Sequence, residues 1–401
     1  MIKIGILREG KTPPDKRVPL TPKQCADLVS QYPDINLTVQ KSPIRCFSDD
    51  EYARHGIALA NNISDCDILM GVKEVPKSDL LDNKTYFYFS HTIKAQPYNR
   101  ELLQKMVKQN ITMIDYETLK HANGRRIIGF GRYAGVVGCY NGFLAYGKRT
   151  KRFELKAANL CEDRIELENE LKKVDLDNIK IILSGNGRVG KGALEIVRLL
   201  GIREVTIEEF KTQEFEEAVF VHVDFPDYNA RIDGAEFAEK DFFTKPELFK
   251  STFMELAKSA DMFVAGHFYA AGSPYLFTRK DAKSPEFKIR TIADISCDID
   301  GPVASTIRPS TIENPLYGYN PHSEEEDDFD KDEVITVMAV DNLPCELPKD
   351  ASEDFGNELI KHVLPLLIGD DPHSIIDKAT ICKNGDLNTP YEYLREYLNG
   401  N

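Results

Sequence analysis

Short apolar runs alternate with longer amphipathic stretches along the first 120 residues. Thr21 and Pro22 form a typical helix start, a capping threonine followed by proline at the first helical position. Further helical stretches are expected around residues 50–54 and 98–109. The apolar runs have the length of strands and span residues 2–7, 36–39, 68–72, 85–89 and 112–115. Strands that alternate with helices predict a parallel α/β sheet.

The same alternation begins again after a long helical region at residues 138–173. A strand at 179–183, a helix at 193–200 and a second strand at 205–208 open this part, and later strands are expected at 261–265, 289–295 and 334–340. Residues 324–333 hold eight acids in ten positions and are expected to form a solvated loop. The C-terminal part, with a helix at 351–367, is too short to fold alone, so we expect it to complete the first domain.

A glycine-rich turn lies between the strand at 179–183 and the helix that follows it. Gly185-Asn186-Gly187-Arg188-Val189-Gly190 matches the pattern GxGxxG. In this context Gly185, Gly187 and Gly190 would let the backbone approach a dinucleotide pyrophosphate, Arg188 and Val189 of the same turn would also bind the cofactor, and the N-terminus of the helix that follows would supply amide donors.

An acid about 20 residues beyond this turn is expected to bind the adenosine ribose hydroxyls. Glu208 and Glu209 stand there, after the expected second strand. A carboxylate would repel a 2′-phosphate, so NAD is favoured over NADP. The pattern predicts an α/β protein with two Rossmann-like, doubly wound parallel-sheet domains and a cleft between them. The substrate domain would comprise residues 1–140 plus 336–401, and the NAD-binding domain residues 141–335.

The amino-acid composition limits the classes of partner that the chain is expected to bind. Its 401 residues carry 51 Lys plus Arg against 65 Asp plus Glu, a formal net charge of -14. This balance argues against nucleic acid or an anionic membrane surface as a partner, because both require a basic face. No segment reaches the roughly 18 uninterrupted apolar residues of a membrane helix. The N-terminus is expected to be a strand and not a signal peptide.

The eight cysteines form no CxxC pair, and none stands with histidines at zinc spacing. We therefore expect no metal site. Reduced thiols in a long chain without a signal peptide are typical of a cytoplasmic protein.

Several motifs indicate a family. Arg8-Glu9-Gly10-Lys11 and the segment 15–22 (DKRVPLTP) resemble the N-terminal signature shared by alanine dehydrogenases, transhydrogenases and lysine-forming saccharopine dehydrogenases. Four later motifs resemble the last branch. They are residues 71–76 (GVKEVP), 89–96 (FSHTIKAQ), 124–126 with 130–135 (GRR, FGRYAG) and 341–348, which contains DNLP and LP. The FSHTIKAQ run and residues 294–298 (DISCD) are also similar to the lysine–2-oxoglutarate reductase half of bifunctional lysine-degrading enzymes.

The resemblance implies a monofunctional oxidoreductase that interconverts saccharopine, NAD and water with lysine, 2-oxoglutarate and NADH. It implies Lys73 and His91 as the acid–base pair. A lysine can act near neutral pH only if burial or a neighbouring cation lowers its pKa, whereas histidine is suited without a large shift.

The substrate in this family carries three carboxylates. The resemblance places Arg17, Lys94 and Arg126 in its pocket, where guanidinium groups make bidentate contacts and an ammonium supplies a point charge. Glu74 and Glu117 are expected beside them, where their charges would influence the acid–base pair.

Asp294 and Asp298 follow a later strand. They are expected to contact the nicotinamide ribose or the substrate amine, with capping of the next segment as the structural alternative.

Two other functions remain open. An alanine dehydrogenase shares Arg17, Lys73 and His91 in type and order, but it holds a single carboxylate, so Lys94 and Arg126 would be surplus. A non-catalytic NAD-binding sensor would have lost Lys73 or His91, yet both are present. In each case the partner is a small molecule, and the sequence leaves the oligomeric state open.

Overall fold

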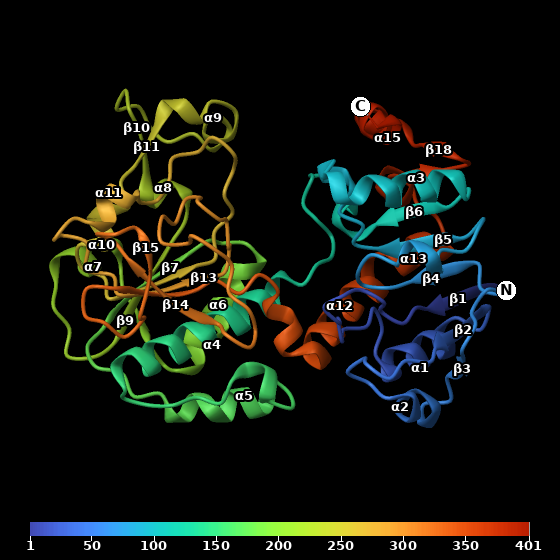
Figure 1. Cartoon of the computed structure of the whole chain (residues 1–401), viewed down its shortest axis with the longest axis horizontal. Coiled ribbons are helices and arrows are strands. Elements are labelled where there is room, and N and C mark those ends of the chain that lie inside the picture. Colours follow the sequence, from blue (N-terminus) through green and yellow to red (C-terminus); the bar gives the residue numbers. More distant parts are fainter. Residues whose placement is uncertain (401) are drawn as a thin grey trace. The chain divides into compact units, whose positions relative to one another are not determined.

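The computed structural model describes residues 1–400, which divide into two compact units (Figure 1). Unit 1 comprises Met1–Phe130 and the chain from Pro348 onward, and unit 2 comprises Gly131–Leu347. The boundaries of unit 2 therefore lie at residues 131 and 347, and not at the expected residues 141 and 335. Helix α4 (Gly131–Thr150) packs along its length in unit 2. The segment before Leu347 stays in unit 2 because Asn141 Nδ2 donates to Glu346 Oε1 at 2.9 Å.

Unit 1 is built on an eight-stranded sheet in the order β18-β17-β6-β5-β4-β1-β2-β3. The six strands from β6 to β3 run parallel, whereas β17 and β18 are antiparallel additions beside β6. Later strands lie on both sides of β1, with β2 and β3 on one side and β4, β5 and β6 on the other. This arrangement is typical of a doubly wound sheet. The strands are β1 (Ile2–Ile6), β2 (Ile35–Gln40), β3 (Ala58–Ala60), β4 (Ile68–Met70), β5 (Thr85–Tyr88), β6 (Thr112–Asp115), β17 (Thr380–Lys383) and β18 (Asp386–Leu387).

The helices of unit 1 include the one predicted from Thr21 and Pro22. Thr21 caps it by accepting a hydrogen bond from the Gln24 amide, and the Gln24 side chain accepts one from the Thr21 amide at 2.9 Å. The helices are α1 (Pro22–Gln31), α2 (Asp49–Arg54), α3 (Arg100–Lys108), α12 (Pro348–His362), α13 (Leu364–Ile368), α14 (Ile375–Ala379) and α15 (Arg395–Asn399).

Two cores cover the two faces of this sheet, because successive strand residues point to opposite sides. Met70 and Phe87 pack on one face with Phe355 of α12. Their neighbours Leu69 and Tyr86 pack on the other face, together with C-terminal residues such as Ile381 and Leu394. The C-terminal segment therefore completes both cores of unit 1.

Unit 2 is built on a second eight-stranded sheet, in the order β15-β14-β16-β13-β12-β7-β9-β8. The strands from β16 to β8 are parallel, and β14 and β15 are antiparallel additions at β16. The two sheets confirm the predicted fold class. The strands are β7 (Lys180–Ser184), β8 (Arg203–Glu204), β9 (Val219–Val223), β12 (Met262–Ala265), β13 (Thr291–Asp294), β14 (Leu316–Asn320), β15 (Glu325–Asp327) and β16 (Ile335–Met338).

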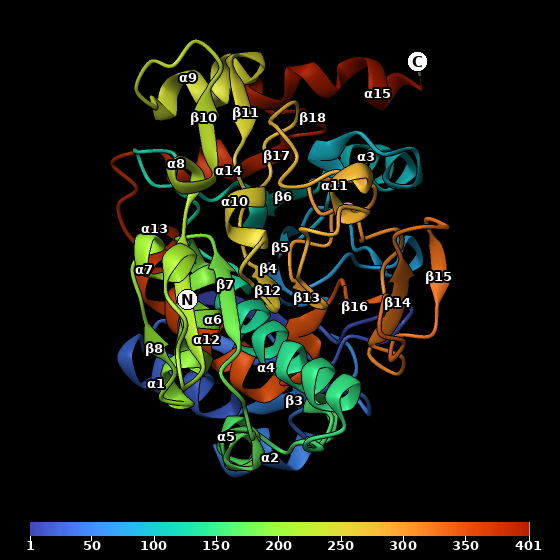
Figure 2. The same cartoon turned by 90° about the vertical axis from the view of Figure 1, so that its left-hand side faces the viewer.

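An excursion between β9 and β12 carries α8 (Phe225–Tyr228), α9 (Glu239–Thr244) and the antiparallel pair β10 (Asn229–Arg231) and β11 (Phe249–Ser251), which Figure 2 shows as a projecting hairpin. The remaining helices are α5 (Arg164–Glu170), α6 (Arg188–Leu199), α7 (Ile207–Thr212), α10 (Met254–Ala257) and α11 (Arg279–Ala282).

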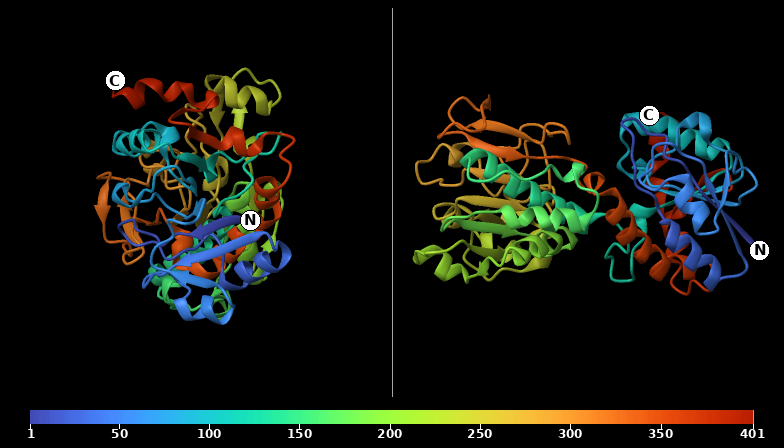
Figure 3. Two further views of the ribbon diagram at one scale, coloured as in Figure 1. Left: turned by 90° about the vertical axis from the view of Figure 1, so that its right-hand side faces the viewer. Right: turned by 90° about the horizontal axis from the view of Figure 1, so that it is seen from below.

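Helices α4 and α6, both green in Figure 3, lie together against the sheet of unit 2. They approach so closely that a Cβ on Gly135 would lie 1.9 Å from the Val189 carbonyl oxygen. Only glycine therefore fits at this crossing.

Two local predictions for unit 2 are wrong. The predicted strand at 205–208 is instead the short edge strand β8 followed by α7. The acidic run is not wholly a loop, because β15 lies within it and pairs with β14. Cations hold its carboxylates: Arg308 pairs with Glu326 at 2.6 Å, and Lys331 pairs with Asp327.

Within residues 1–400, none of the helices has both the length and the apolar character that crossing a bilayer requires.

Glu346 makes the stability of the protein depend on pH. Its side chain is 2% exposed, and burial raises its pKa to about 8. An unfolded glutamate titrates near about 4.3. Between these values the folded state binds more protons, so the free energy of unfolding falls as pH rises, by up to about 1.4 kcal/mol per pH unit.

We expect Glu346→Gln to flatten the decline of the melting temperature between about pH 5 and about pH 8. Melting curves of wild type, Glu346→Gln and the exposed control Glu325→Gln would measure it. Parallel profiles for wild type and Glu346→Gln would contradict the prediction.

Candidate active site

Charged side chains gather at the carboxyl edge of the unit 1 sheet. Lys73 and Glu74 follow β4, and His91 follows the adjacent parallel strand β5. Neighbouring parallel strands end at the same edge, so these segments lie side by side. The structure brings His91 and Glu74 into direct contact, with 2.5 Å between Nδ1 and Oε1.

Glu74 also binds a cation from the segment that follows β1. Lys11 Nζ lies 2.9 Å from Glu74 Oε2. Burial by itself would raise the pKa of Glu74, but the hydrogen bonds from His91 and Lys11 outweigh it and lower the pKa to about 2. Glu74 is therefore an anion that orients the imidazole of His91.

Lys73 meets the physical condition for a base near neutral pH. Burial lowers the pKa of its ammonium, and the charges of Arg17 and Lys11 lower it further, while Asp15 and Glu74 oppose them. Across the part of the chain that the structure describes, the Lys73 ammonium makes no ion pair or hydrogen bond. Its proton is therefore available for exchange.

Arg17 differs from its expected role as an open carboxylate binder. Its side chain is 3% exposed, and its Nε and an Nη donate to the two carboxylate oxygens of Asp15 at 3.0 and 2.6 Å. The guanidinium also lies 4.1 Å from the centre of the Phe130 ring. Burial tends to raise the pKa of Asp15, but the charge of Arg17 and its hydrogen bonds lower it to about 2. In this structure, Arg17 acts on Lys73 through its charge.

A second cluster forms around Glu117, which follows β6. Arg126 donates to Glu117 Oε1 at 3.0 Å, and Lys94 Nζ lies 4.0 Å from the same oxygen. The side chains of Lys94 and Arg126 are 53% and 46% exposed, whereas that of Glu117 is 14% exposed. The two cations can therefore contact a ligand carboxylate while Glu117 holds them in place.

The glycine turn of unit 2 has the geometry that a dinucleotide requires. Gly185 has φ +99°, and a Cβ on Gly190 would lie 1.8 Å from the Gly185 carbonyl oxygen. A Cβ on Gly187 would have no atom within 4 Å, so this glycine leaves open space in front of the turn. Arg188 and Val189 begin α6, whose N-terminal amides face this space. The turn fits a pyrophosphate.

Glu208 and Glu209, the predicted ribose acids, do not follow the strand that lies beside β7. Glu208 and Glu209 lie in the first turn of α7, where Glu209 caps the helix by accepting from the Thr206 amide at 2.8 Å. They follow β8, which is separated from β7 by β9.

The strand beside β7 is β9, and the residue that follows it is Asp224. The Gly185 amide donates to the carbonyl of Val223, the last residue of β9, at 2.9 Å. This contact places the half-buried Asp224 next to the glycine turn. Burial raises the pKa of Asp224. The topology thus assigns Asp224 to the position expected for Glu208 or Glu209.

Asp294 and Asp298 follow β13 at the carboxyl edge of the unit 2 sheet. Asp294 is 1% exposed and accepts hydrogen bonds from the Thr306 hydroxyl at 2.6 Å and the Cys297 amide at 3.1 Å. Burial raises its pKa to about 6. Asp294 therefore supports its loop, and the predicted direct contact with a cofactor does not fit. Asp298 is exposed at the same edge.

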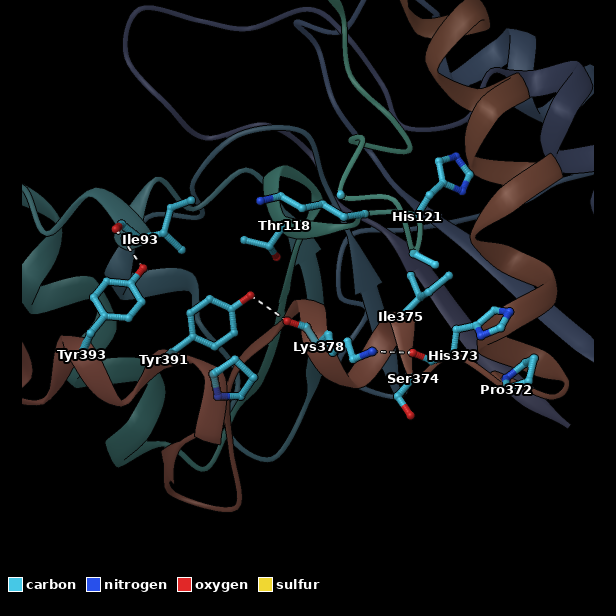
Figure 4. Close-up of a pocket in the computed structure, with 14 residues that line it drawn as sticks. Ile93, Thr118, His121, Pro372, His373, Ser374, Ile375, Lys378, Tyr391 and Tyr393 are labelled. Carbon is cyan, nitrogen blue, oxygen red and sulfur yellow. Dashed lines mark hydrogen bonds between the residues drawn. The ribbon is translucent and has the colours of Figure 1, made fainter. Parts of the chain in front are cut away.

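A separate hollow of about 720 Å³ lies in unit 1 (Figure 4). It is lined by residues that include Thr118, Lys120, His121 and Lys378, and Tyr391 closes part of it by donating to the Lys378 carbonyl at 2.8 Å. Neither Lys73 nor His91 lines it. No three His, Cys, Asp or Glu side chains within residues 1–400 are placed to hold a metal ion.

Three buried or half-buried acids near these sites were not predicted from the sequence. Asp224 could have been found, because it directly follows the apolar run VFVHV, a strand pattern. Glu9 stands within the Arg8–Lys11 motif, and Asp115 ends an expected strand. Nothing in their spacing shows what their carboxylates bind.

Comparison with known proteins agrees with the motifs. Residues 5–137 match the family model "Alanine dehydrogenase/PNT, N-terminal domain". The mitochondrial alpha-aminoadipic semialdehyde synthase of Mus musculus is 28% identical over 98% of this chain, which spans 47% of the mouse protein. The saccharopine dehydrogenase (NAD(+), L-lysine-forming) of Candida glabrata is 25% identical over 90% of this chain and 93% of its own length.

A solved L-alanine dehydrogenase structure shares the fold. It superposes with a TM-score of 0.63 at 17% identity and covers 99% of this chain and 100% of its own. Fold, motifs and sequence similarity thus agree: the chain is similar in sequence to lysine-forming saccharopine dehydrogenases and aminoadipic semialdehyde synthases, and it shares the fold of an L-alanine dehydrogenase.

Proposed function

We propose that this chain is an NAD-dependent oxidoreductase that interconverts saccharopine, NAD and water with L-lysine, 2-oxoglutarate and NADH. The observation that carries the proposal is the arrangement at the carboxyl edge of the unit 1 sheet. There, a lysine of lowered pKa accompanies a histidine held by a carboxylate, Glu74. Two exposed cations, Lys94 and Arg126, form ion pairs with the neighbouring Glu117.

The chemistry requires a hydride acceptor and repeated proton transfers. A bound NAD supplies the acceptor for the hydride that leaves the substrate carbon. Lys73, with its lowered pKa, accepts the proton of the secondary amine. His91 is held at Nδ1 by Glu74, which leaves Nε2 as the nitrogen that exchanges protons with water and the departing amine.

Lys94 and Arg126 support a substrate with several carboxylates. Both side chains are about half exposed, so a carboxylate of a ligand can reach their charged groups. An alanine dehydrogenase would need to neutralise only one substrate carboxylate, so Lys94 and Arg126 would have no substrate group to bind. The proposal therefore favours the tricarboxylate saccharopine over alanine.

Asp224 supports NAD over NADP. A carboxylate beside the glycine turn accepts hydrogen bonds from the ribose hydroxyls and repels a 2′-phosphate.

The reaction can be assayed directly. With purified protein, NADH absorbance should fall when lysine and 2-oxoglutarate are added together, and should not fall when either is omitted. Pyruvate with ammonia is the matched alternative pair. Turnover with pyruvate and ammonia only would replace the proposal with alanine dehydrogenation. NADH binding without turnover of either pair would indicate a sensor.

Removal of the acid–base pair tests the mechanism. Lys73→Met and His91→Gln should each lower kcat by about 10²- to 10⁴-fold, because each deletes a group that moves protons. NADH affinity, measured by fluorescence titration, should stay near the wild-type value because the glycine turn belongs to unit 2. A large loss of NADH affinity would instead assign these residues a structural role.

The corrected ribose acid can be separated from the original candidates. Asp224→Ala should weaken NADH binding by about tenfold, the loss expected for a hydrogen bond to a charged group, and should raise the preference for NADPH. Glu208→Gln, at the first prediction's position, is the control and should change neither value. The reverse pattern would restore the ribose contact to α7.

A further inference from the structure

The four central strands of unit 1 are joined at their carboxyl edge by a series of carboxylates. The strands lie in the order β6-β5-β4-β1. Glu74, after β4, links to His91 after β5 and to Lys11 after β1. Two further acids, Glu9 and Asp115, contact the segments on either side of this pair.

Glu9 follows β1 and holds the segment that carries Lys73. Its Oε1 accepts a hydrogen bond from the Val72 amide at 2.7 Å, and its Oε2 accepts one from the Lys73 amide at 2.9 Å. These amides lie just beyond the end of β4, where no strand partner is available for them. Both carboxylate oxygens are therefore used on the backbone of Lys73 and its neighbour.

The packing around Glu9 leaves little freedom. Its residue is 7% exposed. A Cβ on Gly71 would lie 3.3 Å from Glu9 Oε1, and a Cβ on Gly10 would lie 2.7 Å from Pro76 Cγ. The segments around Glu9 and Lys73 thus meet at close range on both sides of the carboxylate. A shift of Glu9 would displace the backbone of Lys73.

Asp115 ends β6 and holds the segment that carries His91. Its Oδ2 accepts from the Ser90 amide at 2.9 Å and from the Ser90 hydroxyl at 2.5 Å. Its Oδ1 accepts from the Glu117 amide at 2.7 Å. Asp115 is 0% exposed. One carboxylate therefore fixes the residue before His91 and the backbone of Glu117.

His91 needs this support because its backbone is strained. Its φ is +54°, in the left-handed region that non-glycine residues rarely occupy. Ser90 before it and Thr92 after it are tied together, with 2.8 Å between their hydroxyl oxygens. Since Asp115 anchors Ser90, it holds the strained turn in place.

We propose that Glu9 and Asp115 are positioning residues, a pair of buried carboxylates that fix the backbones of Lys73 and His91 from opposite sides. The proposal rests on the proposed function, since it assumes that Lys73 and His91 exchange protons with the substrate. Burying an acid is costly: burial raises the pKa of Glu9 to about 8 and raises that of Asp115, and the hydrogen bonds that each acid accepts from backbone amides oppose this rise. Apolar side chains would avoid this cost but could not accept the backbone amides.

The test uses the full chain with Glu9→Gln and Asp115→Asn, which keep the side-chain shape. An amide offers one acceptor where two donors converge, so each variant leaves an amide without its partner. We expect kcat for lysine and 2-oxoglutarate to fall by about 10- to 100-fold, the loss expected when a reacting group is misplaced. KM for both substrates should change by less than about threefold, because neither acid contacts them.

Glu346→Gln is the matched control, a buried carboxylate changed to an amide in unit 2. It should retain wild-type kcat. Equal losses of kcat in all three variants, or wild-type kcat and pH profiles in Glu9→Gln and Asp115→Asn, would overturn the proposal. Should Glu9→Gln fail to fold by circular dichroism, Glu9→Asp would replace it, because its shorter carboxylate keeps the charge and withdraws the acceptors.

A readout independent of turnover separates this proposal from the proposed function. Lysines would be dimethylated with ¹³C-formaldehyde, and the Lys73 signal would be assigned by its absence in Lys73→Met. Glu9→Gln should shift the pKa measured from this signal, and Glu346→Gln should not. A shift in a protein without lysine–2-oxoglutarate turnover would support the positioning role and refute the function. An unchanged pKa would overturn the positioning role of Glu9.

Discussion

Buried carboxylates that accept backbone amides organise the carboxyl edge of the unit 1 sheet. Strands in a parallel sheet satisfy one another's amides, but the residues that leave the sheet lose these partners. At this edge, Glu9 and Asp115 supply the missing acceptors for the segments after β4 and β5. These carboxylates thus fix the backbone of the segments that carry Lys73 and His91.

The same edge balances charge at close range. Arg17 and Lys11 lie near Lys73 and depress its pKa, yet each is neutralised by its own acid, Asp15 or Glu74. Without those acids, several cations would repel one another in a partly buried site. Without the cations, the acids would raise the pKa of Lys73. The arrangement lowers the pKa of a partly buried lysine while each neighbouring cation keeps an acidic partner.

Unit 2 depends on a different constraint: at some positions its elements approach so closely that only glycine, which has no side chain, fits. The close approach of α4 to α6 at Gly135, and of α6 to the turn after β7 at Gly190, leaves no room for a Cβ. Gly187 is different, because the space next to it is open. The glycines of one motif thus serve two purposes: Gly190 permits packing within the protein, and Gly187 leaves room for a ligand.

The sequence by itself determined the alternation of strands and helices, the start of α1, the glycine turn and the motifs that indicate the family. These are local properties, set by residue spacing and by backbone preferences. It also named Lys73, His91 and Glu74, which the structure brings to one edge. The tertiary structure decided which strand lies beside β7, and therefore that Asp224 and not Glu208 or Glu209 adjoins the glycine turn. It also decided that Arg17 is buried against Asp15, that Asp294 supports its loop, and that Glu9 and Asp115 accept hydrogen bonds from the segments that carry Lys73 and His91. Strand order and the partner of a buried carboxylate arise from contacts between residues far apart in the chain, which local spacing does not encode.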